Sequence, residues 1–164
     1  MTTHVVFTGS PSLTAHLHKF VQWAPSRPVV ARVGKLYLTP DAFARMAPAK
    51  DGRDPLRATA YAAFDLFVEQ GASAYRLFDD SWGKLGVAQM KIMAPSPGSR
   101  LIGAFVDPLL FVGLRLYWRD ELDFKAKGQK GLIDYRTLGQ VAVAEWNMLL
   151  PDVTRRPMKE FRDE

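Results

Sequence analysis

The residues best suited to chemistry are cationic and aromatic side chains that alternate along one apolar segment. From Leu110 to Trp118 the sequence has the period of a β-strand, and Arg115, Tyr117 and Arg119 recur two residues apart. Residues two apart on a strand lie on one face, about 6.6 Å from one another. Arginine binds phosphate oxygens in pairs, and a tyrosine ring offers a surface for base stacking. The pattern predicts a solvent-exposed stripe that binds RNA or single-stranded nucleic acid.

Further basic residues in the middle of the chain extend this expected surface. Residues 84–131 hold eight Lys or Arg against four Asp or Glu, in a chain whose formal net charge is +5. Such an excess suits a polyanionic partner, although ordinary solvation of the surface would fit the same composition. The predicted nucleic-acid or partner-binding residues are Lys91, Arg100, Arg115, Tyr117, Arg119, Lys125, Lys127 and Lys130.

Two acidic clusters are alternative candidates, for binding a divalent cation. The first is Asp120, Glu121 and Asp123, directly after the expected strand; charged residues in this position usually solvate a loop. The second is Asp79-Asp80 followed by Gln89-Met90-Lys91. Its order resembles that of the PD-(D/E)xK nucleases, in which an aspartate and a strand-borne acidic-x-Lys hold a metal and position water. Gln89 replaces the second acidic residue of that pattern, which weakens metal affinity.

Several common kinds of catalysis lack their residues here. The chain has no cysteine, which excludes disulfides and thiolate chemistry. Of its three histidines, His16 and His18 are two apart on an expected helix and point in nearly opposite directions. No phosphate-binding glycine loop, zinc-protease motif or serine-hydrolase motif is present. We therefore expect no metal and no cofactor.

Periodicity in the second half of the chain predicts an antiparallel sheet. Residues 88–92, 101–106 and 110–118 read as strands separated by short turns, with Val112, Leu114, Leu116 and Trp118 on one core face. An amphipathic helix over residues 138–149 ends before Pro151 and can cover one face of the sheet.

The first half predicts shorter elements around one long helix. Leu56, Ala60, Phe64, Phe67 and Val68 share a helical face that ends at Gly71. The other expected elements are a strand at 4–9, a helix over 13–21, a hairpin of 29–33 with 36–39, and a short helix at 40–47; residues 73–80 fit either a helix or a strand. The prediction is an α+β fold: an N-terminal βα segment and hairpin, then an antiparallel sheet of three to five strands covered by helices. One domain would span residues 1–151, with 1–54 as an N-terminal elaboration and 152–164 as a charged tail that frays unless Met158 and Phe161 dock.

From about Leu85 to Trp146 the expected order of elements, preceded by the long helix, resembles the RelE/HigB-like ribonuclease toxins. In that family, Arg, Lys and Tyr side chains on the sheet bind RNA and assist attack by the 2′-hydroxyl. The resemblance would place Lys91, Arg100, Arg115, Tyr117 and Arg119 in the corresponding region. It implies a metal-independent ribonuclease with a neutralising protein partner.

The function that we expect first is non-enzymatic. It is that of a small cytoplasmic protein whose basic, aromatic-containing face engages nucleic acid or a nucleoprotein complex, as a regulatory or inhibitory factor of a mobile element would. The toxin-type ribonuclease is the alternative, and a degenerate PD-(D/E)xK-like nuclease is the third candidate. The longest apolar run, Leu109–Leu114, is far shorter than the roughly 20 residues of a membrane span, so we expect no membrane partner.

Overall fold

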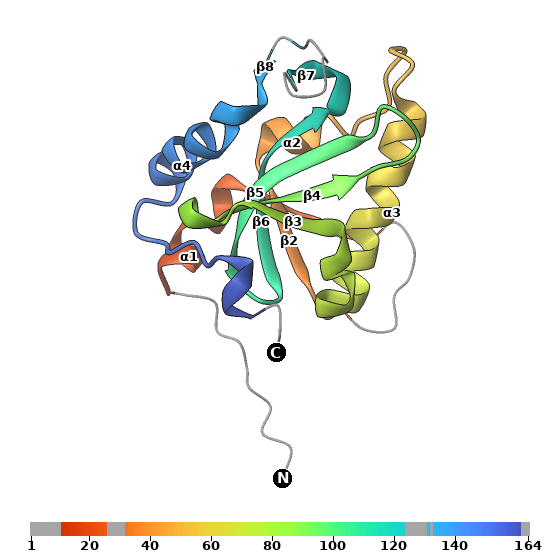
Figure 1. Ribbon diagram of the computed structural model, residues 1–164. Coiled ribbons are helices and arrows are strands. Elements are labelled where there is room, and N and C mark those ends of the chain that lie inside the picture. The colour runs from red at the N-terminus through yellow and green to blue at the C-terminus, as the bar shows by residue number, and fades with distance from the viewer. Residues whose placement is uncertain (1–10, 26–31, 124–130, 132, 162–164) are drawn as a thin grey trace.

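The chain folds around a six-stranded sheet, shown in the computed structural model of Figure 1. The structure describes residues 11–25, 32–123, 131 and 133–161. The strand order is β1-β2-β6-β5-β4-β3, and every neighbouring pair is antiparallel except β2 with β6. The strands are β1 (Val21–Gln22), β2 (Lys35–Leu38), β3 (Phe78–Trp82), β4 (Val87–Ile92), β5 (Ser99–Asp107) and β6 (Leu110–Trp118). A separate parallel pair joins β7 (Leu122–Asp123) to β8 (Ile133–Asp134).

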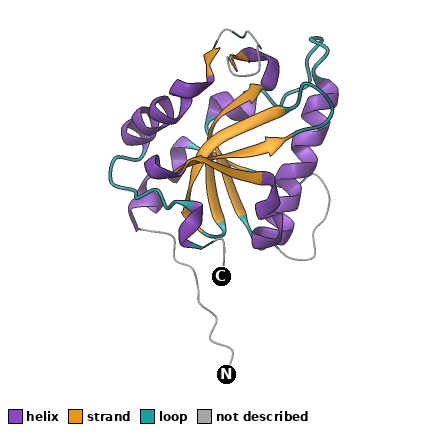
Figure 2. Ribbon diagram, viewed as in Figure 1, coloured by secondary structure: helices purple, strands orange, loops and turns teal. Residues whose placement is uncertain are grey.

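Helices pack on both faces of the sheet, as Figure 2 shows. The helices are α1 (Pro11–His16), α2 (Pro40–Ala44), α3 (Asp54–Gln70) and α4 (Leu138–Leu149), with short 3₁₀ helices η1 (Leu17–Lys19), η2 (Gly71–Leu77), η3 (Gly83–Leu85), η4 (Arg119–Glu121), η6 (Tyr135–Thr137) and η7 (Met158–Glu160). One core cluster joins α2 and α3 to the sheet, and the other joins α1 and α4 to the opposite face. Among the described residues, no helix has the length and apolar character needed to cross a membrane.

The α+β prediction is confirmed, with six strands in the main sheet instead of three to five. The meander of β4, β5 and β6, the long helix α3 and the closing helix α4 lie where the periodicity placed them. Thr39 caps α2 as its sequence suggests: its side chain accepts a hydrogen bond from the backbone N–H of Ala42 at 3.2 Å, and Pro40 follows it.

The N-terminal half differs from the prediction in its pairing. The strand expected at 36–39 is β2, but its antiparallel partner is β1 and not the segment 29–33, of which only residues 32 and 33 are described. The helix expected over 13–21 ends at Lys19, because Phe20 is extended and Val21 enters β1. Residues 71–77 form η2 and the chain then enters β3. The strand expected at 4–9 lies outside the described residues.

The expectation that four alternating residues of β6 share one face is wrong, because a bulge interrupts the strand. Ile102 of β5 lies opposite Arg115, and the next residue, Gly103, lies opposite Gly113. Leu114 is therefore the extra residue of the bulge, and the alternation of faces reverses there.

The reversal divides the expected core face between two layers. Val112 and Leu114 pack in the cluster with α1 and α4, whereas Leu116 and Trp118 pack in the cluster with α3. All four side chains are buried, so β6 is covered on both faces along most of its length. Of the outer stripe predicted for this strand, Arg115 is exposed, and Tyr117 and Arg119 are half-buried.

The segment that follows α4 packs against the rest of the fold as far as Phe161, the last described residue. Arg156 forms a bridge with Phe105 of β5, and Met158 and Phe161 are buried in the α3-side cluster. These contacts satisfy the condition for docking stated from the sequence.

Candidate nucleic-acid interface

Four of the predicted binding residues lie on one face of the sheet. Lys91 of β4 is opposite Arg100 of β5, and Arg100 is opposite Tyr117 of β6. Arg115 lies two residues before Tyr117 on the same face, which is the face covered by α4. We call Lys91, Arg100, Tyr117 and Arg115 the basic row. Arg119 follows the end of β6, in η4. Lys125, Lys127 and Lys130 lie outside the described residues.

Arg100 is a buried cation without a carboxylate partner in the described part of the chain. Its side chain donates to the backbone oxygens of Ser99 at 2.7 Å and Ile92 at 3.4 Å, and to the sulfur of Met93 at 3.5 Å. Only 3% of the residue is exposed. Burial lowers the pKa of Arg100 and the charge of Arg119 lowers it further, while Tyr135 and the Asp79 carboxylate offset part of this shift. A guanidinium in these surroundings is stabilised by any anion that reaches it.

Arg115 is held by carboxylates from two helices. Its Nε donates to Glu145 of α4 at 3.0 Å, and its Nη1 lies 3.6 Å from Asp41 of α2. The hydrogen bond that Arg115 donates to Glu145 raises the pKa of Arg115. Tyr117 is half-buried, and burial raises the pKa of its phenol. Arg115 therefore links the sheet to both helices while it stays exposed to solvent, and Tyr117 is partly covered.

A polar cluster continues the basic row onto β3. The Nζ of Lys91 lies 3.3 Å from a carboxylate oxygen of Asp79, and Asp79 also accepts from the hydroxyl of Ser81. Gln89, opposite Asp79, donates to Ser81 at 2.9 Å and to the hydroxyl of Tyr135 at 2.6 Å. Burial alone raises the pKa of Asp79, but Ser81 and Lys91 more than offset it, and the net shift is downward.

Sequence reasoning missed Ser81 and Tyr135. They come from β3 and η6, and no spacing in the sequence connects them with Gln89. Gln89 is fully buried, and its Oε1 has no hydrogen-bond partner among the described residues. No signal in the sequence pointed to this network, because Gln89 alternates with the apolar residues Ala88 and Met90 and fits a solvent-facing strand position.

The structure does assemble Asp79, Gln89 and Lys91, the three residues that resemble the nuclease pattern. The cluster supplies one carboxylate, whose neighbours are an ammonium, a hydroxyl and an amide. Within the described residues, no group of three or more His, Cys, Asp or Glu is arranged to hold a metal ion. Asp120 and Glu121 of the other acidic cluster form ion pairs instead, at 2.8 Å each, with Arg53 and Arg45.

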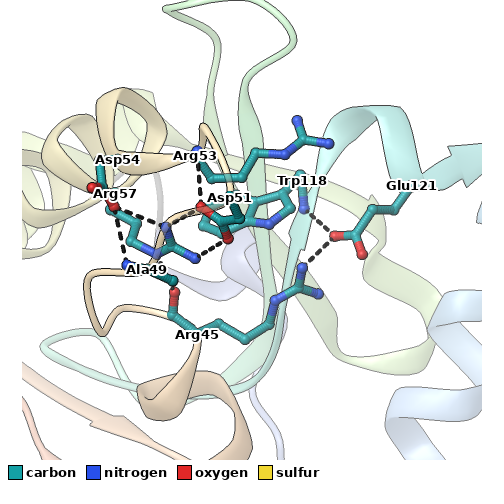
Figure 3. A network of polar contacts seen from close by, with 8 residues as sticks. All are labelled: Arg45, Ala49, Asp51, Arg53, Asp54, Arg57, Trp118 and Glu121. Carbon is teal, nitrogen blue, oxygen red and sulfur yellow. Dashed lines mark hydrogen bonds and ion pairs between the residues drawn. The ribbon is translucent and has the colours of Figure 1, made fainter.

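A second polar network, drawn in Figure 3, anchors the end of β6. The buried guanidinium of Arg57 binds both oxygens of Asp51 at 2.7 and 2.6 Å, Asp54 at 2.9 Å and the carbonyl of Arg45 at 2.8 Å. Arg57 and Arg45 also approach the ring of Trp118, at 5.3 and 5.0 Å from its centroid. Because Arg119 directly follows Trp118, this network positions Arg119 relative to the basic row.

The Asp51–Arg57 pair makes stability depend on pH. The hydrogen bond from Arg57 holds the pKa of Asp51 well below its ordinary value. Because the unfolded chain takes up this proton near pH 4, the pair stabilises the fold above that pH and stops doing so as pH falls through the folded-state pKa. Urea denaturation should show Asp51→Asn less stable than wild type at pH 7, with a smaller difference at pH 2.5. In an Arg57→Gln background the same change should lose this pH dependence; if it persists, Arg57 is not the cause.

Comparison with known proteins gives no information on function, so the functional argument rests on the geometry of the site. The order of elements expected from the sequence is present as α3, β4, β5, β6 and α4, with β3 between α3 and β4 and with β1 and β2 before α3. Architecture of this kind does not define function. The chain matches no protein-family model, no curated protein and no solved structure.

Proposed function

We propose that the protein is a non-enzymatic binder of single-stranded nucleic acid, with the phosphates held beside Lys91, Arg100 and Arg119. The observation that carries the proposal is the state of Arg100. Its guanidinium is buried, has no ion pair with any described residue, and has its pKa lowered by burial and by Arg119. A phosphate bound beside Lys91 and Arg119 would add to the stabilisation that the Asp79 carboxylate already gives this buried guanidinium.

A nucleic-acid strand suits this surface better than a small anion does. Lys91 and Tyr117 flank Arg100 across neighbouring strands, so basic and aromatic groups follow one another over the sheet. The segment that contains them, 84–131, holds twice as many Lys and Arg as Asp and Glu. An extended polyanion can contact several of these groups at once, and each neutralised phosphate adds to affinity by releasing counterions.

Loss of two cations at this site should weaken binding of a labelled single-stranded RNA of 12 nucleotides, measured by fluorescence anisotropy. For Lys91→Gln with Arg119→Gln we expect about tenfold weaker binding or more, because a hydrogen bond to a charged group contributes about 1.5–3 kcal/mol. The slope of log affinity against log salt should become shallower by about 1.4, for two lost phosphate contacts on a single strand.

The matched control removes two cations elsewhere. Arg32 and Lys35 are exposed; Lys35 is the first residue of β2 and Arg32 precedes the strand, at the end of the sheet away from Trp118. Arg32→Gln with Lys35→Gln changes net charge equally, so it should alter affinity far less. Equal losses in the two double variants, or no RNA binding by wild type at about 50 mM salt, would contradict the proposal.

The second candidate, a metal-independent ribonuclease, is favoured by one observation. Asp79, Lys91 and Tyr135 gather beside the charge of Arg100, and groups of these types can transfer protons and stabilise a phosphorane. Electrophoresis of the same RNA after incubation with protein in EDTA separates the two candidates. Intact RNA supports the binding protein. Fragments that disappear in Lys91→Gln would establish the ribonuclease.

A further inference from the structure

A pocket beside β3, outside the basic row, is a second candidate contact for the proposed nucleic-acid strand. Residues 80–85 and Lys159 of η7 line it. It combines an indole, from Trp82, with two ammonium groups, from Lys84 and Lys159, and a carboxylate, from Asp80. Flat aromatic surface next to cations is what a nucleotide requires, since the base can stack while its phosphate is neutralised.

Trp82 is fixed in place by what packs behind it. The ring of Tyr135 lies 5.1 Å from it, at an interplanar angle of 49°. At Gly139 of α4, a Cβ would lie 2.5 Å from Cδ1 of Trp82, so the indole lies against a helix turn that has no side chain. A ring held in this way needs no reordering before a base stacks on it, which lowers the entropic cost of binding.

The two lysines of the pocket are exposed and form no ion pair with any described residue. Their charges are therefore available to a phosphate. Asp80 also lines the pocket, and a carboxylate there can accept a hydrogen bond from an exocyclic amino group of a base.

Trp82 of the pocket and the basic row belong to one face of the sheet. Trp82 lies opposite Val87 of β4, and Val87 and Lys91 point to the same face, four residues or about 13 Å apart. Ser81, Gln89 and Tyr135 connect the two sites by hydrogen bonds. A nucleic-acid strand whose phosphates contact the basic row can therefore extend towards Trp82.

From this geometry we infer that the pocket binds one nucleotide of the strand. Trp82 stacks on the base, Lys84 and Lys159 contact the adjoining phosphate, and Asp80 favours a base that carries an amino group. The inference rests on the proposed function, because it assigns one nucleotide of the same ligand to a second, separately testable site.

Intrinsic fluorescence offers a direct test, because Trp23, Trp118 and Trp146 are each at most 3% exposed and only Trp82 of the four tryptophans is partly exposed. Titration with hexaadenylate should quench the emission and protect it from acrylamide. Inorganic polyphosphate of matching charge should bind without either effect, since it has no base. In Trp82→Phe, whose smaller ring still stacks, the quenching should vanish while affinity stays within a few-fold of wild type.

Affinity provides the second readout, measured by anisotropy with labelled hexaadenylate. Trp82→Ala should weaken binding about 5- to 150-fold, the range expected for one lost base stack. Lys84→Gln with Lys159→Gln should also weaken it, more than the control Arg32→Gln with Lys35→Gln does. If Trp82→Ala does not fold, protection of wild-type Trp82 from acrylamide decides the question.

The outcomes separate this inference from the function on which it rests. Hexaadenylate that binds without quenching or protecting Trp82, and with equal affinity to Trp82→Ala, overturns the pocket while the basic row stands. Binding that depends on Trp82 but not on Lys91 and Arg119 overturns the row as the main site. Absence of binding to wild type overturns both.

Discussion

Replacing Phe105 by alanine is expected to lower the free energy of unfolding by about 3–5 kcal/mol. Phe105 is fully buried in β5, at the centre of the cluster under α3. Its ring contacts five other aromatic rings, those of Phe67, Tyr75, Phe78, Phe111 and Phe161. Truncation would leave a cavity between α3, the sheet and the C-terminal segment, which such a packed cluster can close only in part.

Urea and thermal denaturation of the Phe105→Ala variant measure this loss. For a chain of this size it corresponds to a melting temperature lower by about 6–20 °C. Phe43→Ala in α2 is the matched control, because it makes the same chemical change at an exposed ring. We expect it to cost about 1 kcal/mol or less. Similar losses in both variants would mean that the aromatic cluster is not the stabilising centre of the fold.

Replacing Gly103 by alanine is the second substitution with a large expected effect, because it acts on the bulge. A Cβ at this position would overlap the backbone carbonyl of Val112 and lie 3.0 Å from the Cα of Gly113. These are backbone atoms in the centre of the sheet, so relief requires moving a strand. We expect a loss of about 3 kcal/mol or more, the upper end of the range for overpacking.

Gly52→Ala is the comparison for this variant. Gly52 has a φ of 75°, but its Cβ would have no atom within 4 Å, so only the backbone conformation is strained. We expect it to cost about 1–2 kcal/mol. Because the bulge decides which face Arg115 joins, Gly103→Ala should also disturb the basic row, and backbone amide shifts by NMR should extend to Arg100 and Tyr117. Unchanged stability in Gly103→Ala would show that the bulge does not depend on glycine.

The sequence was enough to predict which residues of the candidate site lie together, but not how deeply they are buried or what they contact. The period of β6 and the turns around it were enough to predict that Lys91, Arg100, Arg115 and Tyr117 lie near one another, and strand register confirms that they do. Their exposure was predicted only in part. Arg115 is exposed although it binds Glu145 and Asp41, whereas Tyr117 is half-buried and Arg100 is buried. Helices α4 and α2 supply these contacts, which strand period alone does not predict.

The sequence by itself determined the elements whose signals are local. Asp54-Pro55 at its start and Gly71 at its end, where φ is 56°, define α3 within a few residues, and short turns define the meander of β4, β5 and β6. Capping groups, turn residues and side-chain period act over a handful of residues and need no distant partner.

Only the tertiary structure decided features that depend on distant segments. It placed β2 parallel to β6, inserted Leu114 as a bulge, and joined Gln89 of β4 to Tyr135 of η6. Parallel pairing and hydrogen bonds between distant segments are selected by the packing of whole layers, which no local period records. The bulge illustrates this most clearly: one unpaired residue in β6 leaves the apolar pattern of the sequence intact, yet it reverses the faces of every residue after it.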